Sequence, residues 1–464
     1  MTKYFILLFL FVSTFSFGQK YNIEIQLKPA AGAKIKLAHY YLGNVYINDS
    51  LQLDNTGHGF FKGDSLLPQG LYKIYLNENN HFDFLLGADQ DFKITNTSFN
   101  ALDMKVSGAT ETEEFEKYVI FLQGLKNKSA EIRAKMKTAG AAEREQLKAE
   151  MSKLTPELHD YWKSVSQKYP NTFLASFLMA NYIPELDIST LPKKIQDNDS
   201  LLLVARFNYQ KEHYWDYFDY TDERFLYTPL FKPKLEEWFT KVLYQDYDSV
   251  KPYVINFIEK TRPHKRIFQF VASWFLNSSV NSHIMGMDAL FVDLAKKYYM
   301  SGEAFWVTDE SMDKIKENLL FAENNLIGMT APELNLESVD GDFISLHSIQ
   351  TEYTMVLIFE PNCSHCKVFV PAFHDKVYEK YKDKGLVVYT IYSMDNRKEW
   401  VDFLTKHNLY DWINVWDKND VSRFKILYDA RTTPGVYVLD QNKKIVAKKM
   451  TVEQLDTFFE HHLN

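Results

Sequence analysis

The first repeated pattern in the chain is an alternation of hydrophobic and polar residues near the N-terminus. Over residues 21–28, Tyr, Ile, Ile and Leu alternate with Asn, Glu, Gln and Lys. An alternation with a period of two is typical of a β-strand with one buried face. Similar short runs recur at 72–76, 82–84 and 92–94, separated by segments rich in Gly, Asn, Asp and Pro. Short strands separated by such turns predict a small antiparallel β-sandwich that ends near Gly108.

Further along the chain the hydrophobic period lengthens to three and four residues. Phe115, Val119 and Leu122 follow this spacing, and a second run with the same spacing begins at Leu147. A spacing of three to four residues places side chains on one face of an α-helix. Runs of the same character continue through the middle of the chain, so we predict a mostly helical domain over residues 109–325.

Strand-like and helix-like segments alternate in the last part of the chain. The strand-like segments are 354–359, 386–392 and 436–439, and the helix-like ones are the stretch after Cys363, 397–407 and 452–462. Strands that alternate with helices are typical of an α/β layer with a mostly parallel sheet. We therefore predict a third domain of the α/β class over residues 326–464.

The first eighteen residues, MTKYFILLFLFVSTFSFG, have the layout of a secretory signal. Lys3 precedes an apolar run, and Ser16 and Gly18 are small residues at the −3 and −1 positions of a cleavage site. This run is too short to span a bilayer, and no second apolar stretch approaches 18 residues. We expect residues 1–18 to be removed, a first domain over 19–108, no transmembrane segment after cleavage, and export to the periplasm or cell envelope.

Composition and charge exclude several classes of protein. A hydrophobic share of 46% in 464 residues is too high for a disordered chain. The formal net charge is −8, and no cluster of Lys and Arg is present that would neutralise nucleic-acid phosphates. The chain has 2 cysteines, which excludes both a disulfide-stapled scaffold and a zinc site built from three or four thiolates.

Both cysteines lie in one short motif, Cys363-Ser364-His365-Cys366, between a predicted strand and a predicted helix. Two thiols at this spacing can form a disulfide with little rearrangement. The first thiol lies at the helix N-terminus, where free N–H groups and the helix dipole stabilise an anion. We therefore predict that Cys363 is a reactive thiolate and that Cys366, one turn further along, is a more buried resolving thiol.

Other functions fit the same motif. The cysteines could form a purely structural disulfide, although so short a loop constrains the unfolded chain only slightly. Cys363, His365 and Cys366, with His374 as a further ligand, could instead bind copper or zinc, which would make the protein a metal carrier. In a third alternative, the first two domains bind an envelope partner and the motif acts only as a redox switch.

Several motifs together resemble the thioredoxin superfamily. They are Cys363-Ser364-His365-Cys366, the Asp340-Gly341 turn before it and Thr432-Thr433-Pro434-Gly435 after it. Ala331-Pro332-Glu333-Leu334 resembles the opening of the TlpA/ResA-like branch of exported thiol-disulfide oxidoreductases. The resemblance covers roughly 326–464, and the preceding regions resemble the β-rich and helical domains that precede thioredoxin domains in some bacterial envelope proteins.

This resemblance implies a thioredoxin-like fold and dithiol–disulfide exchange with protein thiols and disulfides of the cell envelope, without a cofactor or a metal. It also implies that Thr433-Pro434 has a cis peptide bond that faces the two cysteines. His365 occupies a position that is histidine in strongly oxidising members. Its imidazole can stabilise the Cys363 thiolate, and we expect a couple more oxidising than about −270 mV.

The motif also departs from the family at several positions. Leu357 stands where thioredoxins often have a buried acid, and Phe369 stands where ResA-like proteins often have Glu. Asn362 replaces the tryptophan that usually precedes the first cysteine. Proton transfer to and from Cys366 therefore lacks its usual carboxylate. Glu360 is close enough in sequence to take that role, although a solvated loop acid is the simpler interpretation.

Overall fold

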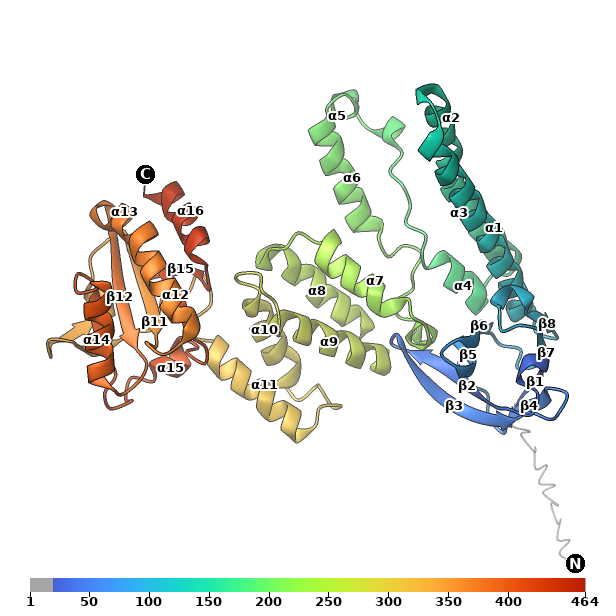
Figure 1. Cartoon of the computed structure of the whole chain (residues 1–464), viewed down its shortest axis with the longest axis horizontal. Coiled ribbons are helices and arrows are strands. Elements are labelled where there is room, and N and C mark those ends of the chain that lie inside the picture. The colour runs from blue at the N-terminus through green and yellow to red at the C-terminus, as the bar shows by residue number, and fades with distance from the viewer. Residues whose placement is uncertain (1–19, 464) are drawn as a thin grey trace, which may run out of the picture. The chain divides into compact units, whose positions relative to one another are not determined.

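The structure is a computed structural model of the chain and describes residues 20–463 (Figure 1). The predicted signal sequence, residues 1–18, lies outside the described residues. The chain forms two compact units, one ending at Leu243 and the other beginning at Tyr244. The domain boundaries predicted at 108 and 325 divide the chain by type of secondary structure and stay a proposal.

The β-rich region lies in the first unit. Its strands are β1 (Tyr21–Leu27), β2 (Lys34–Tyr41), β3 (Asn44–Gln52), β4 (His58–Gly63), β5 (Gly70–Asn77), β6 (Asn80–Leu86), β7 (Asp91–Asn96) and β8 (Lys105–Ser107). They form two sheets with the orders β4-β1-β7-β8 and β3-β2-β5-β6. Every second side chain of β1 is buried, which confirms the alternation. Residues from both sheets share one hydrophobic core, among them Ile23, Leu37, Tyr72 and Phe84.

One strand pair differs from the antiparallel arrangement expected. β1 and β7 are parallel, with Ile23 opposite Phe92, whereas the other pairs of these two sheets are antiparallel. The strands between β1 and β7 in sequence include the whole second sheet, and this long crossover allows the chain to return in the same direction. The hydrophobic alternation indicates which face of a strand is buried, but not which neighbour it pairs with.

Helices follow the strands in the first unit. They are α1 (Thr110–Thr138), α2 (Ala141–Met151), α3 (Leu154–Lys168), α4 (Phe173–Met179), α5 (Lys193–Gln196), α6 (Asp199–His213) and α7 (Phe231–Glu237). Gly140 is the N-cap of α2 and separates it from α1. The sequence did not predict α6. No residue of this described helix is buried, and Leu203 is 69% exposed, so it lacks the one-sided pattern that indicates a packed helix.

Helices also begin the second unit. They are α8 (Tyr247–Thr261), α9 (Lys265–Val280), α10 (Asp288–Leu294) and α11 (Asp309–Ala322). Together with the helices of the first unit they confirm a helical middle region. Among residues 20–463, no helix combines the length and the hydrophobicity needed to cross a membrane.

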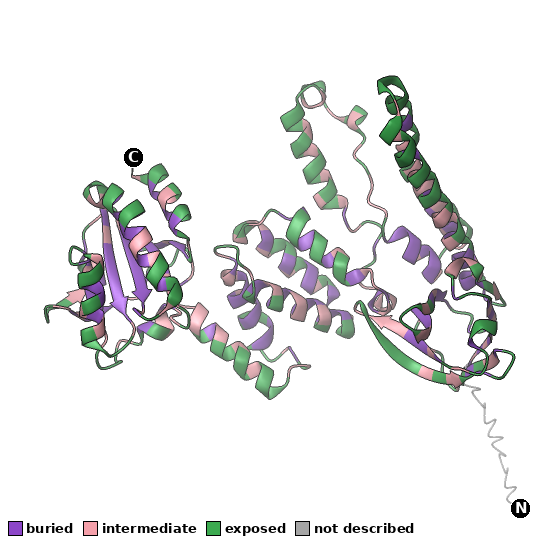
Figure 2. Ribbon diagram, viewed as in Figure 1, coloured by how far each residue is buried: buried purple, intermediate pink, exposed green. Residues whose placement is uncertain are grey.

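The C-terminal part is an α/β layer. Its strands are β9 (Asn335–Ser338), β10 (Phe343–Ser345), β11 (Tyr353–Phe359), β12 (Leu386–Tyr392), β13 (Ile413–Trp416), β14 (Gly435–Asp440) and β15 (Ile445–Lys448). Its helices are α12 (Ser364–Phe373), α13 (Glu379–Tyr381), α14 (Arg397–His407), α15 (Phe424–Leu427) and α16 (Val452–His462). The strand order is β10-β9-β13-β12-β11-β14-β15. Figure 2 shows β11 and β12 as buried. Alternate residues of β11 belong to two separate hydrophobic cores, Leu357 to one and Val356 to the other, so both faces of the sheet are covered.

The prediction of a mostly parallel sheet is wrong for this layer. Parallel pairing joins β11 to β12 and β12 to β13, whereas β14 runs antiparallel to β11 and β15 antiparallel to β14. A tight hairpin connects β14 to β15, since Lys443 N–H bonds to the Asp440 carbonyl at 2.9 Å. Such a hairpin forces antiparallel pairing. β13 and β15 have four residues each, too few for a recognisable period.

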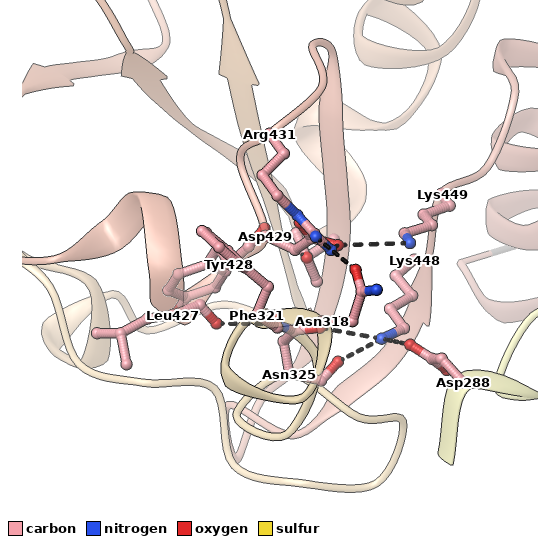
Figure 3. A network of polar contacts seen from close by, with 11 residues as sticks. Asp288, Asn318, Phe321, Asn325, Leu427, Tyr428, Asp429, Arg431, Lys448 and Lys449 are labelled. Atoms are coloured by element: carbon pink, nitrogen blue, oxygen red, sulfur yellow. Dashed lines mark hydrogen bonds and ion pairs between the residues drawn. The ribbon is translucent and has the colours of Figure 1, made fainter. Parts of the chain in front are cut away.

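A buried lysine connects the helices of the second unit to this layer (Figure 3). Lys448 on β15 is 2% exposed; its Nζ donates to the Asn325 carbonyl at 2.7 Å and pairs with Asp288 of α10. Burial lowers the pKa of Lys448, while the Asp288 carboxylate opposes this shift. In the same network Arg431 donates to Asn318 of α11 at 2.8 Å. The loop that precedes β14 is therefore held by α11.

Candidate functional site

The predicted redox motif lies at the start of α12, directly after the buried central strand β11. Cys363 is the N-cap of α12, and its Sγ accepts the backbone N–H of Cys366 at 3.4 Å. An N-cap side chain normally satisfies one of the free N–H groups of the first turn. Here a sulfur atom takes that position, so the N–H group and the helix dipole both favour a thiolate on Cys363.

The loop before β14 lies on the other side of this sulfur. The Cys363 thiol donates to the Thr433 carbonyl at 3.3 Å, and the Thr433–Pro434 peptide bond is cis. Because β11 and β14 are adjacent strands, with Ile358 opposite Gly435, the ends of both strands meet at this point. The structure therefore brings together Cys363, Thr433 and Pro434, which the resemblance grouped.

The two thiols differ in burial and in acidity. Cys363 is partly exposed, whereas Cys366 is completely buried. Burial alone would raise the pKa of the Cys363 thiol, but a hydrogen bond with the side chain of Thr433, distinct from the contact with its carbonyl, and the backbone N–H groups of Cys366 and His365 bring the pKa below its usual value. Burial raises the pKa of Cys366 to about 12. The first thiol is therefore the more acidic of the pair, and the second is protonated at neutral pH.

The other residues of the predicted site lie in the loop before α12 and in the first turn of that helix. His365 is exposed on the first turn of α12, and its backbone N–H contributes to the lowered pKa of Cys363. Glu360 is half-buried, and its carboxylate accepts the Ser393 hydroxyl at 3.2 Å. Asn362, in place of the usual tryptophan, donates to Glu399 of α14.

A cavity of about 870 Å³ lies beside the motif and was not predicted. It is lined by His365, by Val368 and Phe369 of α12, by Pro434 and by Met450 after β15. Val368 is 72% exposed, although it is an aliphatic residue on a helix next to a reactive thiol. Two residues of the cavity lining, Val368 and Phe369, directly follow the motif in the sequence and could have indicated an apolar surface there. The loop that contains Met450 lies at the cavity only because of the tertiary fold.

Family models match two segments of the chain. Residues 327–448 match the AhpC/TSA family, and residues 139–325 match a domain of unknown function, DUF5106. No curated protein matches the chain. The first match covers the sheet, both cysteines and the Thr433–Pro434 loop.

Several solved structures are similar to parts of the chain. A domain of a possible thiol-disulfide isomerase from Cytophaga hutchinsonii is 34% identical, covering 30% of this chain and 92% of that one, with a TM-score of 0.28. The thioredoxin domain of a thiol-disulfide oxidoreductase from Bacteroides vulgatus is 26% identical, with coverages of 30% and 98% and a TM-score of 0.28. A thioredoxin-like protein from Bacteroides caccae is 19% identical, with coverages of 61% and 98% and a TM-score of 0.48.

The AhpC/TSA match and the observed fold agree on the nature of the C-terminal domain. Its central strand leads into a helix that begins at a Cys-x-x-Cys motif, and a cis-proline loop faces that motif. The chain therefore belongs to the thioredoxin superfamily, as a TlpA-like protein of the thiol-disulfide oxidoreductase class in which a β-rich region and a helical region precede the thioredoxin-like domain.

Proposed function

We propose that Cys363 and Cys366 exchange their dithiol and disulfide states with protein partners in the cell envelope. The observation that carries this proposal is the environment of the Cys363 sulfur. It accepts the N–H of Cys366 at the start of α12, while the Thr433 carbonyl lies 3.3 Å away on the opposite loop. A partly exposed thiol with a lowered pKa, next to a buried thiol with a raised one, suits a two-step exchange.

In the reducing direction the Cys363 thiolate attacks one sulfur of a partner disulfide. A bond forms between Cys363 and that sulfur, the partner disulfide breaks, and its second sulfur leaves as a thiolate that takes up a proton. Cys366 then loses its proton and attacks Cys363, which releases the first partner sulfur as a thiolate. The partner gains two electrons, and the Cys363–Cys366 pair is oxidised to a disulfide. The oxidising direction reverses these steps.

The cavity next to the motif is the proposed docking site of the partner. Its lining combines apolar side chains, Val368, Phe369 and Met450, with the backbone of the Pro434 loop. Pro434 has no N–H group, so the loop presents a backbone that an extended partner segment can approach. We therefore propose that the protein binds an extended, partly apolar segment that contains the reactive cysteine of the partner.

Location in the envelope rests on the N-terminal sequence. Residues 1–18 have the layout of a secretory signal, and the reactive disulfide chemistry suits an oxidising compartment. Comparing the N-terminus of the protein purified from cells with that of the encoded chain tests this proposal. A mature chain that begins near Gln19 in the envelope fraction agrees with it, and an intact Met1 in the cytosol contradicts it.

Trapping of mixed disulfides tests the exchange. In Cys366→Ser no intramolecular thiol can open the disulfide between Cys363 and a partner. We expect slow-migrating adducts on non-reducing gels that disappear with dithiothreitol. Cys363→Ser is the matched control, because it keeps the buried thiol and removes the attacking one. If both variants give the same adducts, or neither gives any, the proposed exchange is contradicted. The alternative of a partner-binding module with a redox switch would then be favoured.

A further inference from the structure

A second cluster of chemically active side chains lies in the thioredoxin-like domain, away from the cysteines in sequence. Ligand atoms of His374, Glu379 and Asp411 lie within 4.8 Å of one another. His374 and Glu379 follow α12, and Asp411 lies in the segment between α14 and β13. By sequence, His374 is only a further ligand in the alternative of a metal site at the two cysteines, and no pattern in the sequence indicates Glu379 or Asp411.

A local change of helix type brings the first two residues together. The segment His374–Tyr378 is π-helical, and the N–H of Glu379 bonds to the carbonyl of His374. Five residues cover about 1.4 turns of an α-helix, which would place these two side chains on different faces. In a π-helical turn the backbone hydrogen bond joins residues five apart, so the side chains of His374 and Glu379 lie on the same side of the helix. Such π-helical turns occur frequently at functional sites.

The imidazole of His374 is held in one orientation. Its Nδ1 lies 2.9 Å from the Asp375 carboxylate, and its ring lies 5.8 Å from both the Tyr378 and the Trp412 rings. His374 is 9% exposed, and its Nε2 has no hydrogen-bond partner among the described residues. If Nδ1–H donates to Asp375, the Nε2 lone pair points into the cluster. A carboxylate that fixes the tautomer in this way is the usual second partner of a metal-binding histidine.

The distance between the facing ligand atoms suits an ion between them. His374 Nε2 and Glu379 Oε1 are 3.6 Å apart, which is too long for a hydrogen bond. Two ligands about 2.0–2.2 Å from a tetrahedral ion lie roughly 3.4 Å from each other. A lone pair and carboxylate oxygens repel one another unless a proton or a cation lies between them.

Neighbouring residues hold the carboxylates without occupying every oxygen. Lys382 Nζ pairs with Glu379 Oε2 at 2.7 Å, which leaves Oε1 facing the histidine. The Tyr378 hydroxyl donates to the backbone carbonyl of Asp411 at 3.4 Å and fixes that segment. The cluster therefore offers one imidazole and two carboxylates on a supported frame.

We propose that His374, Glu379 and Asp411 bind a divalent transition-metal ion of the Zn²⁺ class. A nitrogen ligand together with two carboxylates favours such an ion over Mg²⁺ and Ca²⁺, which prefer oxygen ligands alone. Three protein ligands leave one position for water. The bound ion would join the π-helical segment after α12 to the segment before β13, and thereby stabilise the domain without taking part in thiol exchange.

Titration of the full chain with Zn²⁺ tests the site. The protein is first oxidised so that the Cys363–Cys366 disulfide removes both thiols as ligands. We expect one equivalent to bind in isothermal titration calorimetry, millimolar Mg²⁺ not to compete, and Co²⁺ to give a visible absorption without a thiolate charge-transfer band. His374→Gln and Asp411→Asn should each raise the Kd at least tenfold. His461→Gln is the matched control, because it removes an exposed histidine of the same domain, and it should leave the Kd unchanged.

Clear outcomes would overturn the proposal. They are an absence of Zn²⁺ binding to the oxidised wild-type protein, binding that both His374→Gln and Asp411→Asn leave unchanged, or binding lost in His461→Gln. Asp411 is exposed, so Asp411→Asn keeps the test valid if replacement of the buried His374 prevents folding. An increase in the melting temperature with Zn²⁺ in the wild type but not in Asp411→Asn would support the stabilising role.

Discussion

The Sγ atom of Cys363 lies 3.3 Å from the carbonyl oxygen of Thr433, a residue 70 positions later in the chain. The contact arises because β11 leads into Cys363 and the Thr433 loop leads into β14, and these strands are neighbours. A partner that reaches the thiol must therefore also contact this loop. In the proposed exchange, the reactive thiol and the partner segment therefore meet at one place in the fold.

The two thiols should react with an alkylating reagent at different pH. Hydrogen bonds lower the pKa of Cys363, whereas burial raises that of Cys366 to about 12. Because the thiolate is the reacting form, labelling of Cys363 should rise with pH through a midpoint below the free value of about 8.5. Labelling of Cys366 should need strongly alkaline conditions. Peptide mapping of the reduced protein over a pH series measures both, and faster labelling of Cys366 would reverse the assignment.

Two substitutions of His365 should separate the effect of its side chain on the reduction potential from the effect of its backbone N–H. The backbone N–H of His365 helps to lower the pKa of Cys363, and proline has no N–H. His365→Pro should destabilise the thiolate and lower the reduction potential by tens of millivolts, where about 30 mV corresponds to about 1.4 kcal/mol. His365→Ala keeps the N–H, so its smaller shift measures the imidazole alone. Equilibration with glutathione gives the potentials, and equal values for both variants and the wild type would exclude any role for His365.

A charge in the cavity should weaken partner capture without changing the thiols. Val368 lines the cavity and is 72% exposed. Val368→Asp, made in the Cys366→Ser background, should reduce the yield of mixed-disulfide adducts several-fold, because an apolar partner segment would meet a carboxylate. Val421→Asp is the matched control, since Val421 is 76% exposed in the same domain and does not line the cavity. Equal losses in both variants would show that the cavity is not the docking site.

Breaking the ion pair of Lys448 should lower the free energy of unfolding strongly, whereas removing both charges should lower it much less. Lys448 is 2% exposed and pairs with Asp288 of α10. Asp288→Asn leaves the buried ammonium without a counter-charge and should lower the free energy of unfolding by roughly 3 kcal/mol, the lower end for such a loss, because Asn325 still accepts from Nζ. Combining Asp288→Asn with Lys448→Met removes both charges of the pair and should cost much less than Asp288→Asn alone.

Urea denaturation of the full chain measures this difference as a change in the free energy of unfolding of the second unit. Glu310→Gln breaks an ion pair with Lys314 in which both side chains are largely exposed, and it should have little effect. If Asp288→Asn is as mild as this control, the Lys448 network does not stabilise the fold.

Local patterns in the sequence were sufficient for many elements of the fold. The alternation at 21–27 and the hydrophobic run at 386–392 match β1 and β12, and the helical spacing at 397–407 matches α14. Such patterns report which side of an element is buried, and that information is carried by residues next to one another in the chain. The chemistry of Cys363 was predictable for the same reason, since an N-terminal helix position acts on the nearest side chain.

Contacts between distant segments were decided only by the tertiary structure. The parallel pairing of β1 with β7, the antiparallel β14–β15 hairpin and the loop containing Met450 beside the cavity all depend on which segments pack together. His374 and Glu379 lie close together because of a π-helical turn, which the hydrophobic period of the sequence does not predict. A single sequence records the burial of each side chain but not the identity of its distant neighbours. The position of Cys363 at a helix N-terminus could therefore be predicted from the sequence, whereas the cavity beside the motif and the His374 cluster could not.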